Sequence, residues 1–441
     1  MSRCVFKSVP HASKLPSKAS LNLIGVVGYL WLAVLGWIAP FFSQVPIGRG
    51  SAPAIRKLRE TAKNARASCV RWHNSRRGGR FYLGMTAAAG GALILSTMTE
   101  TVREPADRAA LDAALQRMGL ISSGERARYT ALTGGVASDI WKVDTATRSF
   151  AIKRALPKLK VADDWFVPVE RNAFEVKWME VVRGILPRAV PPLIGHDPQA
   201  GLFAMAYLDP ATYRNWKNEL REGRTDEAFA AAVGHTLARI HAASAKDPVI
   251  AAAFATDETF HAIRLAAYLE ATAPKHPQAA DVLMALSRNT LATKLSLVHG
   301  DVSPKNILIG PDGPIFLDAE CAWYGDPAFD LGFCLNHMLL KCLWTPRAAA
   351  GFLALFEILA QTYLTGVNWE PPSIMERRTA HLLPGLFLAR VDGKSPAEYV
   401  TAESDKARVR LVALNFLAQP PERLADIREA WAREIGIKVL A

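Results

Sequence analysis

The stretch 297–320, LVHGDVSPKNILIGPDGPIFLDAE, decides the fold of this 441-residue chain. It places Asn306 five residues after Asp301, and Asp318 seventeen residues after Asp301. Two short apolar runs, NILIG and PIFLD, flank the turn residues Pro311-Asp312-Gly313, and this pattern predicts a β-hairpin. Because a hairpin returns the chain to its starting end, we expect Asn306 and Asp318 to lie together.

These three side chains suit one kind of chemistry. Amide and carboxylate oxygens are the ligands that Mg²⁺ prefers, so Asn306 and Asp318 are suited to hold Mg²⁺ against the phosphates of a nucleotide. Asp301 would then stand beside the metal as a base for a substrate hydroxyl. This layout indicates phosphoryl transfer of the kinase type.

Two motifs carry a family resemblance. HGDVSPKN, at 299–306, resembles the HGDxxxxN loop of the aminoglycoside phosphotransferase and choline kinase superfamily. FLDAECAWYGDPAFDLGF, at 316–333, resembles the second motif of that superfamily, in which an acid follows the aspartate by two residues. This stretch and LARVDGKSPAEY, at 388–399, are most similar to methylthioribose kinase-like members. The resemblance covers about residues 105–430 and is absent before residue 98.

The resemblance implies an α+β fold of the bilobal protein-kinase type. A small β-rich N-lobe over 98–208 would bind the nucleotide, and a larger, mainly helical C-lobe over 209–441 would carry the catalytic loop and the substrate site. It also implies ATP and Mg²⁺ as cofactors, with Glu320 assisting Asn306 and Asp318 at the metal.

The expected N-lobe supplies a lysine for the phosphates. The β-rich run SFAIKRAL places Lys153 in mid-strand, and the resemblance implies that a helix carboxylate orients it. The amphipathic segment 169–187 offers Glu170 and Glu175, of which Glu175 is preferred.

Two further N-lobe segments are expected to contact the nucleotide. Gly134-Gly135 form a turn whose backbone amides could approach phosphate, with Ser138 as a hydroxyl donor. The apolar strand LFAMAYLDP, at 202–210, corresponds by resemblance to the hinge between the lobes. Backbone groups at Ala206 and Leu208 would meet the adenine edge there, and Met205 would line the pocket.

Charge is divided very unevenly along the chain. The net charge is +12, but residues 1–97 hold 14 Lys and Arg against one acid, whereas the rest holds 39 basic and 40 acidic side chains. The kinase part is therefore nearly neutral, and no nucleic-acid partner is expected for it. Five cysteines show no CxxC spacing, so neither a disulfide nor a zinc site is predicted.

Residues 1–97 admit two interpretations. Leu21–Phe42 is uncharged and about 22 residues long, which is enough to span a bilayer. A helix there would anchor a cytoplasmic catalytic part to the inner membrane. The alternative is translated upstream sequence before a natural start at Met98, where polar residues lead into an amphipathic helix. The sequence does not predict an oligomeric state.

The acceptor is expected to be a small molecule with a hydroxyl group. Residues 330–400 hold six acids and six bases, so they show no acidic excess for a polycationic aminoglycoside. Trp323 offers an aromatic ring near the second motif, and Arg390 stands where methylthioribose kinase-like relatives place a substrate-facing arginine, although those relatives carry a pair. With Asp301, these are the candidate substrate residues. A hydroxylated metabolite, sugar-like or an amino alcohol, ranks first and an aminoglycoside second.

The sequence disfavours two other classes of protein. A protein kinase is disfavoured because GxGxxG, HRD, DFG and APE are all missing from the sequence. A membrane-tethered, catalytically silent kinase fold used as a binding module would require decayed motifs. Lys153, Asp301, Asn306 and Asp318 are all present, so the sequence favours a small-molecule kinase.

Overall fold

The computed structural model describes residues 105, 107–132, 138–156 and 170–438. Residues Ser96–Ala441 form one compact unit. The predicted membrane segment 21–42 and the predicted phosphate turn at Gly134-Gly135 lie outside the described residues.

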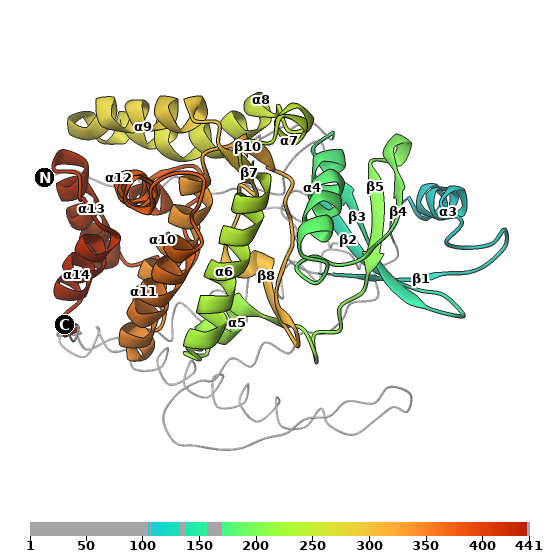
Figure 1. The fold of residues 1–441 in the computed structure, drawn as a ribbon. Helices are drawn as coiled ribbons and strands as arrows, with labels where there is room; N and C mark the ends of the chain where they lie inside the picture. The colour runs from blue at the N-terminus through green and yellow to red at the C-terminus, as the bar shows by residue number, and fades with distance from the viewer. Residues whose placement is uncertain (1–104, 106, 133–137, 157–169, 439–441) are drawn as a thin grey trace, which may run out of the picture. The chain divides into compact units, whose positions relative to one another are not determined.

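The N-terminal part of this unit is built on an antiparallel sheet of five strands in the order β1-β2-β3-β5-β4 (Figure 1). Its elements are α3 (Arg108–Arg117), β1 (Arg128–Ala131), β2 (Ser138–Asp144), β3 (Ser149–Ala155), α4 (Arg171–Ile185), β4 (Leu193–Asp197), the 3₁₀ turn η2 (Pro198–Ala200) and β5 (Leu202–Ala206). Phe150 and Ile152 of β3 pack in a core with Leu111 and Leu115 of α3. Because side chains alternate along a strand, Lys153 lies on the other face of the sheet.

The larger C-terminal part is mainly helical. It comprises β6 (Arg214–Asn215), α5 (Trp216–Arg221), α6 (Glu227–Ser244), α7 (Pro248–Ala253), α8 (Asp257–Phe260), the π-helix η3 (His261–Glu270), the 3₁₀ turns η4 (Ala273–Lys275) and η5 (Pro277–Ala279), α9 (Ala280–Ala292), β7 (Ser296–Val298), the 3₁₀ turn η6 (Pro304–Asn306), β8 (Ile307–Gly310), β9 (Gly313–Phe316), β10 (Trp323–Gly325), α10 (Pro327–Trp344), η7 (Pro346–Ala348), α11 (Ala349–Thr365), α12 (Pro372–Asp392), α13 (Glu403–Ala418) and α14 (Leu424–Glu434). Helix α10 packs against α11 and α12, and α11 packs against α6 (Figure 1). The predicted fold, a β-rich part followed by a larger helical part, is confirmed.

The predicted hairpin is also confirmed. Strands β8 and β9 pair from Ile307 opposite Phe316 to Gly310 opposite Gly313, so the turn consists of Pro311 and Asp312. Gly313 has φ +122°, a conformation that L side chains rarely adopt. Beyond the hairpin, the Leu317 amide donates to the Asn306 carbonyl over 2.9 Å. The chain therefore returns Asp318 to the end where Asn306 lies.

One helical segment among the described residues, Pro346–Thr365, has the length and apolar composition of a membrane span, and 44% of it is buried. It consists of η7 and α11, and α11 packs against α6, α10, α12 and α14. Those contacts are typical of a helix in a protein core.

Candidate active site

Lys153 stands at the centre of a buried group of charges where the β-rich and helical parts meet. Its Nζ lies 2.8 and 2.7 Å from the two carboxylate oxygens of Glu175 on α4, and it also pairs with Asp318. Only 2% of Lys153 is exposed. The structure therefore contains the lysine–carboxylate pair predicted for Glu175, and it joins the pair to the second motif.

A second ion pair completes this group. Arg171, in the first turn of α4, donates from Nε to Glu320 over 2.9 Å and from Nη2 to the Leu156 carbonyl over 2.8 Å. We call Lys153, Arg171, Glu175, Asp318 and Glu320 the nucleotide cluster. It contains three carboxylates and two cations, so its formal charge is negative.

Burial and charge shift the pKa values of this cluster in opposing ways. Burial raises the pKa of the Glu175 carboxyl to about 7 and also raises the pKa of Glu320. Burial acts in the same direction on Asp318, but the Lys153 and Lys305 ammonium groups outweigh it and hold the pKa of Asp318 below its usual range. Burial alone would lower the pKa of Lys153, yet Asp318 and Glu175 raise it above its ordinary value. The ion pair of Lys153 with Asp318 thus stays charged at neutral pH.

Asp318 has a strained backbone. Its φ is +67°, in the left-handed region that non-glycine residues seldom occupy, which costs on the order of 1–3 kcal/mol. The preceding residue, Leu317, is held by two hydrogen bonds: its amide donates to Asn306, and its carbonyl accepts from His299 Nε2 over 3.1 Å. Strain at a charged residue in this position is typical of a functional site.

Hydrogen bonds from the loop to Asp330 on α10 hold the loop that carries Asp301 in place. Asp330 accepts hydrogen bonds from the amides of His299 at 2.7 Å and Gly300 at 2.8 Å. His241 contacts the same carboxylate at 3.3 Å. A β-carbon on Gly300, whose φ is +78°, would lie 2.6 Å from the Cys321 carbonyl oxygen, so the position requires glycine.

His299 links the two motifs through both of its ring nitrogens. Nδ1 accepts from the Asp301 amide at 3.1 Å, and Nε2 donates to the Leu317 carbonyl. Burial lowers the pKa of His299, so the ring is neutral with its proton on Nε2. These bonds give His299 a structural role in the loop.

Asp301 is held by two cations. Its Oδ2 lies 3.1 Å from Arg264 Nη2 and 3.2 Å from Lys305 Nζ. Arg264, from the π-helix η3, also donates from Nε to the Gly300 carbonyl. Among the described residues no partner is found for Asp301 Oδ1, so that oxygen remains available to an acceptor.

Asn306 completes the set. Its Nδ2 donates to the Asp301 carbonyl over 3.1 Å, which leaves Oδ1 as the amide atom for other ligands. In addition, Lys305 influences the pKa of Asp318 while contacting Asp301. The structure therefore brings Asp301, Asn306 and Asp318 to one place.

Without a nucleotide, these residues do not supply a complete set of Mg²⁺ ligands. Within the described part of the chain, no three His, Cys, Asp or Glu side chains converge as a ready-made metal centre. Asp318 and Glu320 are instead engaged by Lys153 and Arg171. Mg²⁺ usually binds through one or two carboxylates together with phosphate oxygens and water, so this donor set fits a metal that arrives with a nucleotide.

The other predicted nucleotide contacts lie along the sheet. Ser138 is the buried first residue of β2, and Met205 and Ala206 end β5. The Ala206 amide donates to the Pro192 carbonyl at 2.9 Å. An adenine at the hinge would therefore have to bond to the Ala206 carbonyl instead of the amide. Leu208 follows the strand and is half-buried.

The structure contradicts the prediction for Trp323. Strand β10 pairs with β7, and this pairing turns Trp323 into the core, where none of it is exposed. Its ring stacks on Phe260 with centroids 4.1 Å apart, and its Nε1 donates to Asp257 over 3.2 Å. Trp323 is a packing residue and does not reach a substrate.

Arg390 lies on α12, 8% exposed. Its Nη1 contacts the Tyr268 hydroxyl at 3.4 Å and Ser395 Oγ at 3.1 Å. Tyr268 in turn lies under Arg264, whose Cζ is 6.0 Å from its ring centroid. One tyrosine thus separates Arg390 from the arginine that holds Asp301.

Sequence reasoning missed Arg171 and Arg264. Their partners lie 149 and 36 residues away, at Glu320 and Gly300. No local pattern marks either arginine, because each is defined by a tertiary contact. The π-helical geometry of η3, which often occurs at functional sites, was not visible in its ordinary amphipathic sequence.

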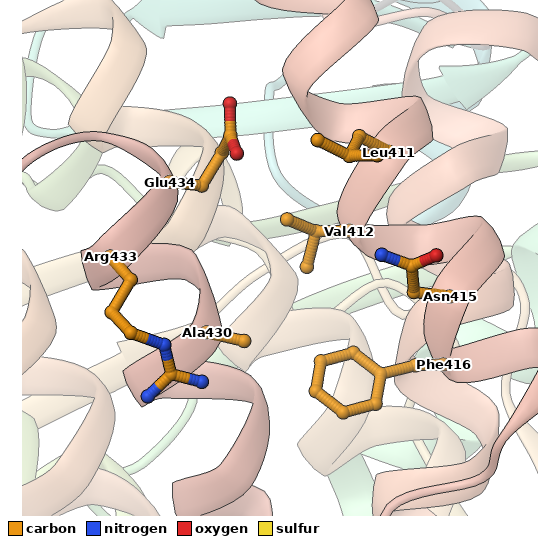
Figure 2. A pocket seen from close by; sticks show the side chains of 7 residues that line it. All are labelled: Leu411, Val412, Asn415, Phe416, Ala430, Arg433 and Glu434. Carbon is orange, nitrogen blue, oxygen red and sulfur yellow. The ribbon is translucent and has the colours of Figure 1, made fainter.

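A separate cavity of about 350 Å³ lies between α13 and α14 (Figure 2). Its lining is Leu411, Val412, Asn415, Phe416, Ala430, Arg433 and Glu434. It contains none of the residues predicted for the active site, so it is not where we place the chemistry.

The class of protein follows from comparison with known families. Residues 128–366 match the phosphotransferase enzyme family, and this is more than half of the chain. The chain therefore belongs to that family, and the superfamily predicted from its motifs is confirmed.

Individual relatives are more distant. The chain is similar to the methylthioribose kinase of Bacillus cereus (strain AH820), with 23% identity over 240 residues, which cover 48% of this chain and 61% of that protein. It is also similar to methylthioribose kinase 2 of Oryza sativa subsp. japonica, with 25% identity over 278 residues, covering 54% and 63%. The matched part spans less than two thirds of each relative.

Solved structures resemble the chain weakly. A choline/ethanolamine kinase family protein from Mesorhizobium loti has 16% identity and a TM-score of 0.41, covering 74% of this chain and 99% of that one. A spectinomycin phosphotransferase in complex with ADP and spectinomycin has 14% identity and a TM-score of 0.39, covering 69% and 93%.

Proposed function

We propose that this protein is an ATP-dependent kinase that transfers the γ-phosphate to a hydroxyl group of a small molecule. The observation that carries the proposal is the joining of two charged groups by one loop. The stretch 301–320 carries both: Asp318 belongs to the nucleotide cluster, and Asp301 is held by Arg264 and Lys305. Membership of the phosphotransferase enzyme family supports the same class of reaction.

The nucleotide is bound by the N-lobe in this proposal. Lys153, oriented by Glu175, neutralises phosphate charge. The phosphate turn consists of Gly134-Gly135 with Ser138, and the adenine pocket is made by Met205, Ala206 and Leu208. Domain boundaries after residues 97 and 208, and membrane attachment through residues 21–42, stay part of the proposal.

Asn306 and Asp318, assisted by Glu320, would hold Mg²⁺. When bound, this ion neutralises charge on the terminal phosphates. For Asp318 to serve, Lys153 would shift its ammonium from that carboxylate toward the phosphates.

Asp301 acts on the acceptor. Its Oδ2 is held by Arg264 and Lys305, so Oδ1 takes the hydroxyl proton. The acceptor oxygen forms a bond to the γ-phosphorus, the bond to the β–γ bridging oxygen breaks, and ADP leaves. Arg264 thus positions the base, and the loop braced by Asp330 keeps the oxygens aligned.

An ATP-consumption assay of the full chain over ribosides, amino alcohols, hydroxy acids and aminoglycosides tests the proposal. Asp301→Asn should lower kcat by about 10²- to 10⁴-fold, because it removes the general base. Asp312→Asn is the matched control, since Asp312 lies in the exposed hairpin turn and pairs only with Arg188 among the described residues. Unchanged turnover in Asp301→Asn would refute this role for Asp301.

A further inference from the structure

A stripe of side chains runs along α10 away from the catalytic loop. Phe333, His337, Lys341 and Trp344 are spaced by four, four and three residues, so they share one face of the helix. The stripe begins at Arg264, whose Cζ lies 5.8 Å from the Phe333 ring centroid. The Phe333 and His337 rings follow at 5.5 Å.

Lys341 is the unusual member of the stripe. It is 1% exposed, and its Nζ lies 4.5 Å from the Trp344 ring and 4.8 Å from the Tyr399 ring. Among the described residues its ammonium has no hydrogen bond and no ion pair. Burial, followed by repulsion from Lys217, lowers its pKa to about 7. A buried cation without a counter-charge is costly and rarely kept without a function.

Other cations surround Lys341. Arg390 is close enough to influence its charge state, and the buried Arg390 Nε has no hydrogen-bond partner among the described residues. Lys217, from α5, lies over Trp344 and pairs with Glu398. Burial and the nearby Arg390 and Lys341 push the pKa of His337 well below its usual range, so that ring adds no charge.

We call this set the acceptor cluster. Its cations are Arg264, Lys305, Arg390, Lys341 and Lys217, and its carboxylates are Asp301 and Glu398. Five cations against two carboxylates give the cluster a net positive charge, and Lys341 and Arg390 retain unused donors.

We propose that the acceptor carries an anionic group, a carboxylate or a phosphate, which binds at Lys341 and Arg390 while its hydroxyl faces Asp301. This inference rests on the proposed kinase function, because Asp301 defines where the hydroxyl lies. An anion would supply the missing counter-charge of Lys341 and a partner for Arg390 Nε.

The same geometry disfavours cationic acceptors. A polycationic aminoglycoside would meet like charges at close range and be repelled by them. The Trp344 and Tyr399 rings stack 4.4 Å apart and already hold the ammonium of Lys341, so they are not available as a cage for a choline-like cation.

Matched probes test this inference on the full chain. Glycerol, glycerate, glycerol 3-phosphate and 3-amino-1,2-propanediol share a hydroxylated frame and differ in charge. Their affinities would be measured by calorimetry in the presence of Mg²⁺ and a saturating non-hydrolysable ATP analogue, which keeps the anions out of the γ-phosphate position. We expect at least one anionic probe to bind about tenfold more tightly than glycerol, and the amine to bind more weakly. The two anionic arms distinguish carboxylate from phosphate.

Substitutions of Lys341 complete the test. Lys341→Met should abolish the preference for the anion, and Lys341→Arg should retain it. Lys406→Met on α13, which has none of the contacts above, is the matched control. Lys341→Met should also raise the melting temperature, whereas loss of a merely structural lysine would lower it. Equal affinity for charged and neutral probes, or full anion affinity in Lys341→Met, would overturn the inference. Anion binding without any γ-phosphate transfer would instead refute the kinase proposal and leave the anion site standing.

Discussion

The nucleotide cluster and the acceptor cluster both draw on the stretch 301–320 and carry opposite formal charge. The first has three carboxylates and two cations, and the second has two carboxylates and five cations. A negative group fits the Mg²⁺ that accompanies a nucleotide, and a positive group fits an acceptor that brings its own negative charge. The formal charge of each cluster thus indicates the opposite charge of the group expected to bind there.

Among the effects that separate the two clusters, the largest is expected at Asp318, the proposed metal ligand that pairs with Lys153. Asp318→Asn should lower kcat by about 10³-fold, because it removes a proposed Mg²⁺ ligand and a partner of Lys153. Initial rates as a function of Mg²⁺ concentration measure this effect. A variant with wild-type kcat and wild-type Mg²⁺ dependence would show that Asp318 does not hold Mg²⁺.

Lys153→Met should act on the nucleotide and on folding together. The nucleotide Kd should rise by about tenfold or more, while the acceptor Kd stays within twofold. Because Asp318 and Glu175 would lose the buried cation they share, the free energy of unfolding should fall by about 3–5 kcal/mol. Adding Glu175→Gln should restore part of the stability and none of the nucleotide affinity, as chemical denaturation and calorimetry would reveal. Equal loss of both affinities would show that the two clusters are not separable.

The free energy of unfolding should depend on pH through Lys341 of the acceptor cluster. The pKa of Lys341 is about 7 in the folded protein, against an ordinary value near 10.5. Between these values the unfolded state binds more protons, so this residue makes stability rise with pH, by at most about 1.4 kcal/mol per unit. The charges that act on it are Lys217, Arg390 and Glu398.

Denaturant unfolding of the wild type and Lys341→Met at pH 7 and pH 9.5 measures this contribution. The advantage of the methionine variant should shrink as the pH rises. An advantage that is constant with pH would mean that Lys341 does not titrate in this window. For the same reason, the KM of an anionic acceptor should rise above pH 7, where Lys341 loses its proton.

The smallest effect is expected at Trp323. Trp323→Phe should cost about 1–2 kcal/mol of stability, since it disturbs the stack on Phe260 and removes the bond to Asp257. Its acceptor KM should stay within twofold of the wild type. A large change in the acceptor KM would show that Trp323 does contribute to the substrate site.

Sequence reasoning succeeded where the information was local. The hairpin that joins Asn306 to Asp318 lies within one short stretch, and its turn residues and apolar strands were visible in the sequence. The pairing of Lys153 with Glu175 was reached only through the family resemblance, and its pairing with Asp318, 165 residues away, was not predicted. The N-lobe helix and the β-rich segment around Lys153 were likewise apparent from their periodicity.

The acceptor side could not be predicted in this way. Arg264, Lys341 and Arg390 come from three helices, and counting acids and bases over residues 330–400 gave an even balance that hid their convergence. The prediction for Trp323 failed for a related reason, because a motif does not show which face of a strand is turned into the core.

A crystal structure with Mg²⁺ and a non-hydrolysable ATP analogue tests the central claim most directly. We predict that oxygens of Asn306 and Asp318 bind one Mg²⁺ at about 2.0–2.1 Å together with phosphate oxygens, and that Asp301 lies beside the γ-phosphate without contacting the metal. A nucleotide bound elsewhere, or a metal that contacts neither Asn306 nor Asp318, would contradict the account.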